Sequence, residues 1–385
     1  MKLKERNFTF DLLYVLAIIM VVDDHTKAQL GILKAIFPYD SFFMPLFVFI
    51  SGYFYKKQNV IKNIKHKTEK IFIPYMIWNV IMLGITIIID RILKTNWAIG
   101  INKVKVLNSI FLGPLVTTNG PSWFVIMLFW VSILYNLIRN VIKPNKINDC
   151  ILTIISIIAG LISVYLCVKG WNKKSSLMLF VLRTLFYIQF YHLGYIFKEH
   201  IEDRIKKANK YIICSICVII NVILIAIYGD KVNFYATSNM RGFSYWYLPI
   251  ITSITGITFW YIIMDYVANK IKESKIITYI AQNTFFIMET HLLFANIINI
   301  LFYIFNKMGI KYFLKFDTKS FIQSAWSGSA WNMNSRFGII GFLLGITLSI
   351  ALVTLINKSK EKIRTKIDKT NKSIDEGEKI WNMII

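Results

Sequence analysis

Ten long apolar segments, separated by short polar stretches, dominate this chain of 385 residues. Hydrophobic residues make up 56% of the sequence and occur in continuous runs, unlike the periodic stripes of a soluble domain. Because a helix of about 17 to 25 apolar residues crosses a bilayer, the sequence predicts an all-α integral membrane protein, a bundle of about ten transmembrane helices. The expected spans lie near residues 8–24, 41–55, 71–90, 122–140, 150–168, 178–197, 210–228, 245–266, 279–304 and 337–356.

The loops between these spans are too short for a soluble domain of about 100 residues. We expect one transmembrane domain over residues 1–357, followed by a basic cytoplasmic tail over residues 358–385 in which charges of both signs alternate. The second span is short enough to be tilted or partly re-entrant, so a count of nine or eleven spans stays open. Any chemistry must then take place within the membrane or at its faces.

The net charge of +24 predicts an orientation in the membrane. With ten spans, the side that holds both termini carries 28 Lys and Arg, the opposite side carries 16, and Arg183 lies inside a span. Because Lys and Arg are enriched in cytoplasmic loops, we expect a multi-pass protein of the cell membrane with both termini in the cytoplasm. The expected partner is the lipid bilayer and not a nucleic acid, since the charge is spread over loops on opposite sides. The abundance of Ile, Lys and Asn suggests an AT-rich genome and thus a bacterial source.

The first span carries ionisable groups along its length. Such a group within hydrocarbon costs roughly 2.5 to 3.5 kcal/mol, so its presence points to a function. On a helix, Tyr14 and His25 lie about 20° apart around the axis and about 16 Å apart along it. Asp11 and Tyr14 are therefore expected near the cytoplasmic end, and His25 near the outer end. Because helix neighbours point about 100° apart, Asp24 is a less certain partner of His25 than a residue from another helix.

Later spans add Arg183 and His192 in the sixth and Glu289 and His291 in the ninth. One interpretation is a structural ion pair between Arg183 and Glu289 inside the bundle. The other is a polar cavity that His25, His291 and nearby carboxylates share, in which an imidazole takes a proton near physiological pH. The predicted catalytic residues are His25, Asp24, Glu289 and His291.

Motifs for metals, cofactors and nucleotides are absent from the sequence. The four cysteines lie in or at the edge of apolar segments, and Cys214 and Cys217 have no second pair to complete a metal site. The sequence shows no P-loop, no dinucleotide-binding glycine fingerprint and no nucleophile elbow. We therefore expect no metal site and no permanently bound cofactor. The lack of a P-loop also excludes an ATP-driven transporter with its own motor.

Six segments, taken together and in order, resemble the acyltransferase 3 family, membrane enzymes that O-acylate extracytoplasmic glycans. Each segment is a weak signal alone, but together the six cover most of the chain. They are FDLL at 10–13 with the apolar run that ends in His25, FMPLFVFISGYF at 43–54, KIFIPY at 70–75, PSWF at 121–124, YHLGY at 191–195 and IMETHLL at 287–293.

The resemblance implies a cytoplasmic acyl-CoA donor, usually acetyl-CoA, an acceptor hydroxyl on the outer side, and His25 as the central catalytic residue. This chain departs from the family at Tyr14, where many members carry Arg or Lys eleven residues before that histidine. Either Lys70 or another basic residue replaces this cation, or the donor differs. The predicted substrate-binding residues are Asp11, Tyr14, Lys70, Ser122, Trp123, Arg183 and His192.

Two roles for His25 stay open. It either deprotonates the acceptor hydroxyl or carries the acyl group itself for a time. Ser122, Trp123 and Arg183 are the candidates for stabilising the oxyanion of the transition state. The basic run between residues 56 and 70 either attracts the phosphates of CoA or reflects orientation in the membrane alone.

A transporter or flippase for a glycan or lipid-linked intermediate is the main alternative, because many spans with buried charges also describe carriers. The sequence shows none of the internal repeats that many carriers have. A structural or sensory membrane subunit is a further alternative, for which the polar spans would need another explanation. The acceptor cannot be read from the sequence. Lipoteichoic acid, exopolysaccharide, peptidoglycan and antibiotic-like glycosides all stay open, as does a homodimer.

The charge split generates a topological prediction. A single cysteine introduced at Thr370, in a variant without the four natural cysteines, should not react with a membrane-impermeant thiol reagent added to intact cells. It should react once the membrane is permeabilised, because a cytoplasmic tail is then accessible. Labelling of position 370 in intact cells would contradict the assignment.

Overall fold

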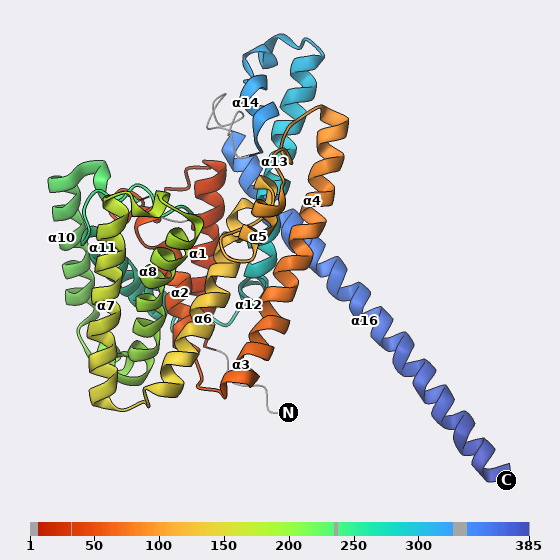
Figure 1. The fold of residues 1–385 in the computed structure, drawn as a ribbon, viewed down its shortest axis with the longest axis horizontal. Helices are drawn as coiled ribbons and strands as arrows, with labels where there is room; N and C mark the ends of the chain where they lie inside the picture. Colours follow the sequence, from red (N-terminus) through yellow and green to blue (C-terminus); the bar gives the residue numbers. More distant parts are fainter. Residues whose placement is uncertain (1–6, 32, 235–237, 326–336, 385) are drawn as a thin grey trace.

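The computed structural model describes residues 7–31, 33–234, 238–325 and 337–384. These residues form helices joined by loops, and no strand occurs among them (Figure 1). Each of the ten predicted spans corresponds to a helix, so the predicted fold class is confirmed. These helices are α1 (Phe8–Thr26), α2 (Phe43–Tyr53), α4 (Ile73–Leu93), α6 (Trp123–Val141), α7 (Lys146–Val168), α8 (Ser176–Ile196), α10 (Lys210–Tyr228), α11 (Leu248–Ala268), α13 (Thr284–Lys307) and α16 (Gly338–Ile384).

Shorter helical segments connect or extend these helices. The α-helical ones are α3 (Val60–Lys67), α5 (Lys103–Ser109), α9 (Glu202–Lys207), α12 (Lys275–Gln282) and α14 (Thr318–Gln323). Five 3-10 segments are η1 (Tyr39–Ser41), η3 (Thr117–Ser122), η4 (Trp171–Lys173), η6 (Gly229–Val232) and η7 (Lys311–Lys315). Two π-helical segments, η2 (Thr68–Phe72) and η5 (Phe197–Ile201), continue α3 into α4 and α8 into α9.

Eight helical runs in the described part of the chain are long and apolar enough to cross a membrane. They contain α4, α6, α7, α8, α10, α11, α13 and α16, several of them extended by a neighbouring short segment. The other two predicted spans differ from these eight. Helix α2 has 11 residues, which make about 16 Å of helix, and α1 carries three aspartates within its 19 residues. The predicted count of about ten is therefore approximate.

Helices α1 and α2 lie inside the bundle. Helix α1 contacts α11, α12, α13 and α16, and α2 packs along α8. Of the 19 residues of α1, 14 are buried, whereas α10 buries only Cys217 and Asn221. The long apolar helices thus shield α1, with its three aspartates, and α2, the shortest of the ten helices that match predicted spans, from lipid, where ionisable groups are costly.

Two glycines allow the close contact between α2 and α8. A side-chain carbon at Gly52 would collide with the backbone carbonyl of Tyr191, and one at Gly194 would collide with the backbone carbonyl of Phe49. Small residues let membrane helices approach until their backbones are in van der Waals contact. The position of α2, which follows the loop after α1, therefore depends on this pair of glycines.

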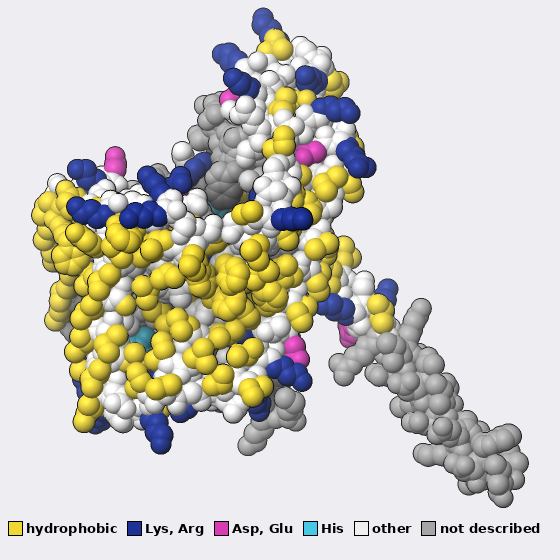
Figure 2. All heavy atoms as spheres, viewed as in Figure 1, with side chains coloured by type: hydrophobic (Ala, Val, Ile, Leu, Met, Phe, Trp, Pro, Cys, Tyr) yellow, Lys and Arg dark blue, Asp and Glu magenta, His cyan; other side chains and the backbone are white. Residues whose placement is uncertain are grey.

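One face of the bundle carries a hydrophobic band of the kind that contacts lipid (Figure 2). Figure 2 shows a broad band of hydrophobic side chains across the body, with Lys and Arg side chains along its upper and lower rims. Helix α1 begins and α16 ends toward the lower edge of the view (Figure 1). The residues that we assigned to the tail, as far as Ile384, continue α16 as a helix beyond the bundle.

A lobe rises above the hydrophobic band at the top of the view (Figures 1 and 2). This upper lobe comprises residues 89–99 and 298–325, which include the ends of α4 and α13 together with η7 and α14. Its core is an aromatic cluster in which Trp97 packs with Phe302 and Phe321. The indole Nε1 of Trp97 also donates a hydrogen bond of 2.6 Å to the backbone oxygen of Phe321. The two segments therefore form one packed unit.

The glycine contact gives a stability prediction. The substitution Gly194→Ala should lower the melting temperature of the purified protein by several degrees, because overpacking a tight contact costs about 1 to 3 kcal/mol. Gly84 in α4 is the matched control, since nothing lies within 4 Å of a carbon added there. Gly84→Ala should leave the melting temperature unchanged or raise it, because Ala favours a helix over Gly. Equal effects of the two substitutions would contradict the contact.

Candidate active site

Two histidines from helices far apart in the sequence form a direct hydrogen bond. His25 lies in the last turn of α1 and His291 in the first half of α13. The Nδ1 atom of His25 is 2.8 Å from Nε2 of His291, and the two rings are nearly parallel, with 9° between their planes. The side chain of His291 is fully buried. The structure thus brings together the two histidines that the sequence placed in the first and ninth spans.

The hydrogen bonds around His291 assign the protons of this pair. Nδ1 of His291 lies 2.6 Å from the backbone oxygen of Ile287. A carbonyl oxygen only accepts, so Nδ1 carries the hydrogen, and Nε2 of the neutral His291 ring must be an acceptor. The hydrogen between the rings therefore belongs to Nδ1 of His25. Nε2 of a neutral His25 ring is then the basic nitrogen, the atom that a general base or nucleophile uses.

A cavity of about 650 Å³ lies beside this pair. His25 and Asp24 from α1 line it together with Asp40 from η1. The opposite wall consists of α5 and the loop that leads through η3 into α6, and the loop before α11 contributes Arg241. Met288 of α13 also lines it. His291 and Glu289 are not among its described lining residues, so His25 is the histidine that the cavity exposes.

The carboxylates of this cavity do not orient His25. Asp24 Oδ1 lies 3.1 Å from Nζ of Lys27 and 3.6 Å from Nζ of Lys34, so its charge is neutralised by two lysines. Burial, together with the neighbouring Asp24 carboxylate, raises the pKa of Asp40 above its ordinary value. The Nδ1 atom that a carboxylate would orient is bonded to His291 instead. The described partner of Nδ1 of His25 therefore comes from another helix.

The interpretation in which Arg183 and Glu289 form an ion pair is not supported, because the described partners of the two side chains are other groups. The guanidinium of Arg183 donates to the backbone oxygens of Phe111, Leu112 and Ser238 at 2.7 to 3.1 Å. It ties the loop after α5 and the loop before α11 to α8, and it lies over the ring of Trp123 at 5.3 Å. Arg183 is thus a structural residue of the cavity wall.

Glu289 is fully buried behind η3. Its Oε2 accepts a hydrogen bond of 3.2 Å from Nδ2 of Asn119. Its Oε1 has no partner among the described residues. Nδ2 of Asn119 also lies 3.3 Å from the hydroxyl of Ser122. Glu289 therefore supports the η3 segment, whose Thr117 and Gly120 face the cavity, and it does not contact His25.

Two further cavities share lining residues with each other, and the second of them also shares Met288 with the cavity of His25. One of about 360 Å³ is lined by Tyr14, His66 and Lys67, and one of about 320 Å³ is lined by Tyr14 and Lys70. Met288 lines both the second of these and the cavity of His25. A chain of cavities therefore runs from the lysine-rich end of α3 and η2 to His25, with Tyr14 along it and Met288 as a shared wall.

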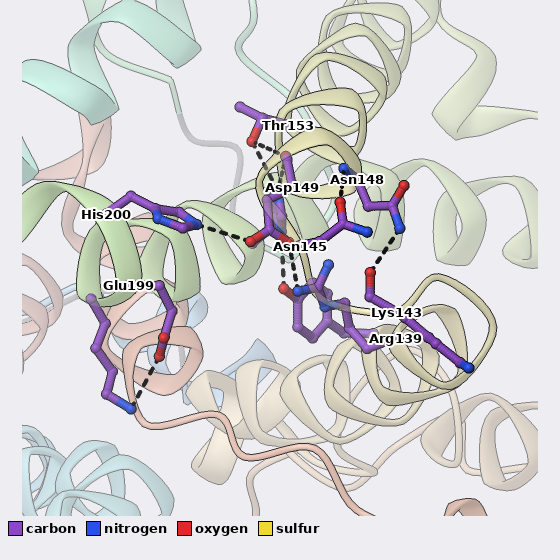
Figure 3. A network of polar contacts seen from close by, with 11 residues as sticks. Arg139, Lys143, Asn145, Asn148, Asp149, Thr153, Glu199 and His200 are labelled. Atoms are coloured by element: carbon purple, nitrogen blue, oxygen red, sulfur yellow. Dashed lines mark hydrogen bonds and ion pairs between the residues drawn. The ribbon is translucent and has the colours of Figure 1, made fainter.

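Ser122 and Arg183, described above, are not among the described lining residues of the three cavities, and neither are Asp11 and His192. Asp11 accepts a hydrogen bond of 2.9 Å from the Thr278 hydroxyl and joins α1 to α12. His192 lies 2.9 Å from the hydroxyl of Tyr135 and 3.0 Å from that of Thr153. Its contacts join α6, α7 and α8. Thr153, one of its partners, also belongs to the network of polar contacts around Asp149 in Figure 3. Both residues have structural partners in the bundle.

Asp149 is the centre of this network of polar contacts (Figure 3). Its two carboxylate oxygens lie 2.7 Å from Nη2 of Arg139 and 2.9 Å from Nε2 of His200. Arg139 is fully buried, and the contact holds α6, α7 and η5 together. Contacts within the bundle therefore account for His192, and its polarity does not by itself indicate a ligand site.

Sequence reasoning missed several residues of the cavities. Asp40, Lys105 and Met288 line the cavity of His25, and Asn119 supports Glu289. Asn119 lies two residues before the PSWF segment, which is the one sequence signal that marks its neighbourhood. Lys105 and Met288 carry no such signal, because a lysine in a loop and a methionine in a span are ordinary there.

Comparison with known proteins assigns the chain to a family of membrane enzymes. A family model described as an acyltransferase domain matches residues 7–356. No curated protein and no solved structure matches the chain.

The separate roles of Arg183 and Glu289 can be tested by a double-mutant cycle. Arg183→Gln should destabilise the protein strongly, because each buried carbonyl left without a donor costs about 1 to 3 kcal/mol. Glu289→Gln should change the melting temperature little, since a Gln oxygen still accepts from Asn119. In the double variant the two effects should add within about 0.5 kcal/mol. A strong coupling of the two substitutions, measured by thermal unfolding in one detergent, would restore the ion pair.

Proposed function

Because the chain belongs to the acyltransferase domain family, which it matches over residues 7–356, we propose that it is a membrane O-acyltransferase. It takes an acyl group, with acetyl expected, from a cytoplasmic acyl-CoA and transfers it to a hydroxyl of an extracytoplasmic glycan or envelope polymer. The observation that carries this proposal is the hydrogen bond between His25 and His291 at the wall of the 650 Å³ cavity. This hydrogen bond leaves Nε2 of His25 as the basic nitrogen, beside a cavity that an acceptor hydroxyl can enter.

The His25 and His291 pair supports a general-base mechanism. Nε2 of His25 removes the proton of the acceptor hydroxyl while the hydroxyl oxygen attacks the thioester carbonyl. The new ester bond forms as the bond between carbonyl carbon and sulfur breaks, and the CoA thiolate leaves and is protonated. His291 accepts the Nδ1 hydrogen of His25 throughout, so the ring keeps one tautomer and one orientation.

A covalent route uses the same nitrogen. Nε2 of His25 attacks the thioester, and an acyl-imidazole forms as the CoA thiolate leaves. The oxygen of the acceptor hydroxyl then takes the acyl group as the acyl–nitrogen bond breaks, and the hydroxyl proton passes by way of the freed Nε2 to the CoA thiolate. The two routes differ in one observable. Only the covalent one labels His25 when acyl-CoA is supplied without an acceptor.

The two smaller cavities fit a donor that enters from the cytoplasmic side. Lys67 and His66 line one of them, Lys70 lines the other, and Tyr14 lines both. Cations at this end suit the phosphates of CoA, and they replace the basic residue that many family members have at the position of Tyr14. The thioester end of the donor would then point along the cavities toward Met288 and His25. No permanently bound cofactor is needed.

The cavity wall limits which residues can stabilise the oxyanion. The terminal nitrogens of Arg183 are committed to three backbone oxygens, and Ser122 lies next to Asn119. Trp123 lines the cavity itself. Of the three candidates, we therefore retain Trp123 as the residue next to the reacting groups, with Ser122 and Arg183 holding the wall.

The proposal places the protein in the cell membrane of a bacterium with both termini in the cytoplasm, and it does not require a homodimer. A transporter or flippase would carry the glycan across without changing it. Purified protein in liposomes, given labelled acetyl-CoA and a panel of envelope glycans, distinguishes these functions. Label in a glycan supports acyl transfer, whereas movement of an unlabelled glycan supports a carrier.

Substitutions of the two histidines test the mechanism. His25→Ala should lower the acyl transfer rate by roughly 10² to 10⁴, because general acid–base groups contribute that much, while the melting temperature stays near that of the wild type. His291→Leu should lower the rate as well, and His291→Gln should recover part of it, because the Gln oxygen can accept the Nδ1 hydrogen of His25. Wild-type rates in His25→Ala, or equal losses for Leu and Gln at 291, would exclude this role of the pair.

A further inference from the structure

The upper lobe carries an excess of exposed positive charge. Its basic residues are Arg91, Lys94, Lys307, Lys311, Lys315 and Lys319, all exposed. None of these six forms an ion pair with a described acidic residue. The lobe is therefore a strongly basic surface, and Figure 2 shows several of its Lys and Arg side chains at the top of the view.

The two acidic residues of the lobe are used by its own backbone. Asp90 accepts hydrogen bonds from the Thr95 hydroxyl and from the backbone nitrogens of Trp97 and Ala98 at 2.6 to 2.9 Å. Asp317 caps α14 and accepts from the backbone nitrogen of Ser320 at 3.0 Å. The Asp317 carboxylate also interacts electrostatically with Lys319, but six basic residues against two acidic ones leave the lobe with a net positive charge.

Orientation in the membrane does not explain this charge. Short loops on the outer side are normally poor in Lys and Arg, yet the lobe stands on the side that the charge split assigns to the outside. Eight of the 16 Lys and Arg on that side lie in the lobe or in α5, which follows it. Because orientation in the membrane does not account for this basic surface, we attribute the surface to the binding of a ligand.

The basic surface continues to the mouth of the His25 cavity. Lys103 and Lys105 lie on α5, and Lys105 lines the cavity. Arg241 lines it from the loop before α11. The acidic group beside His25, Asp24, is already paired with Lys27 and Lys34. An anionic ligand can therefore extend from the lobe to the cavity without meeting an unpaired Asp24 charge.

We propose that the upper lobe binds an acceptor polymer with a repeated anionic group, a phosphodiester or a carboxylate, and leads its hydroxyls to the cavity of His25. This inference rests on the proposed acyl transfer and names the class of its acceptor. Several lysines, each facing a different repeat, would hold such a chain through charge-assisted hydrogen bonds. A neutral glycan would gain nothing from the lobe.

The test uses the full chain in nanodiscs of neutral lipid and poly(glycerol phosphate) as the probe. A lobe variant combines Lys307→Gln, Lys311→Gln, Lys315→Gln and Lys319→Gln. The control variant removes the same charge from exposed lysines of the lower side, through Lys143→Gln, Lys146→Gln, Lys272→Gln and Lys275→Gln. The apparent Kd of the polymer should be at least about 10-fold higher for the lobe variant than for the wild type. For the wild type, this Kd should rise steeply with salt concentration, because binding of the phosphates releases counterions. In the control variant it should stay within about 2-fold, and dextran should bind none of the proteins.

Binding is measured apart from turnover, so the two proposals can fail separately. A His25→Ala protein should still bind poly(glycerol phosphate), and the KM for this acceptor should rise in the lobe variant with kcat unchanged. Lobe-dependent binding without any acyl transfer would sink the proposed function and leave the anionic ligand standing. Equal polymer binding by wild type and lobe variant overturns the inference. So does a lobe variant that loses binding only to vesicles of anionic phospholipid, which would make the lobe a lipid-binding surface.

Discussion

The cost of placing ionisable groups in hydrocarbon governs the arrangement of this protein. Helix α1 carries three aspartates and a histidine, so it cannot face lipid, and the apolar helices surround it. Helix α2 is too short to cross a membrane alone and is held against α8 by the contacts of Gly52 and Gly194. Burying these two helices creates a polar interior in which the cavities form. The cost of exposing ionisable groups to lipid therefore determines both how the helices pack and where the site lies.

Within that interior, the His25 and His291 pair is fixed by a backbone group. The carbonyl of Ile287 sets the tautomer of His291, and His291 sets that of His25. The orienting group is thus a neutral imidazole, where a carboxylate is the more familiar choice. Asp24, the nearest carboxylate in sequence, is held by Lys27 and Lys34.

The sequence predicted the helices well and the contacts between them less well. Long apolar runs indicate burial or lipid contact directly, so nine of the ten predicted segments match a helix to within about five residues at each end, whereas α16 continues past the predicted end to Ile384. Pairing between helices depends on rotation and depth, which the runs do not encode. His25 and His291 were placed together through a shared polarity, whereas the interpretation that paired Arg183 with Glu289 rested on charge alone, and Arg183 donates to three backbone oxygens instead. Asp11 and His192 had polar partners that no spacing reveals.

The shared wall at Met288 has an electrical consequence. With water in the cavities on both sides, most of the membrane potential falls across the short stretch around this side chain. Under the proposed acyl transfer, an uncharged acyl group would cross that stretch without electrical work. The hydroxyl proton would be released on one side and the CoA thiolate on the other, and each elementary charge moved between them is worth about 2.3 kcal/mol per 100 mV. Turnover would then separate charge, and its rate would respond to the energised state of the cell.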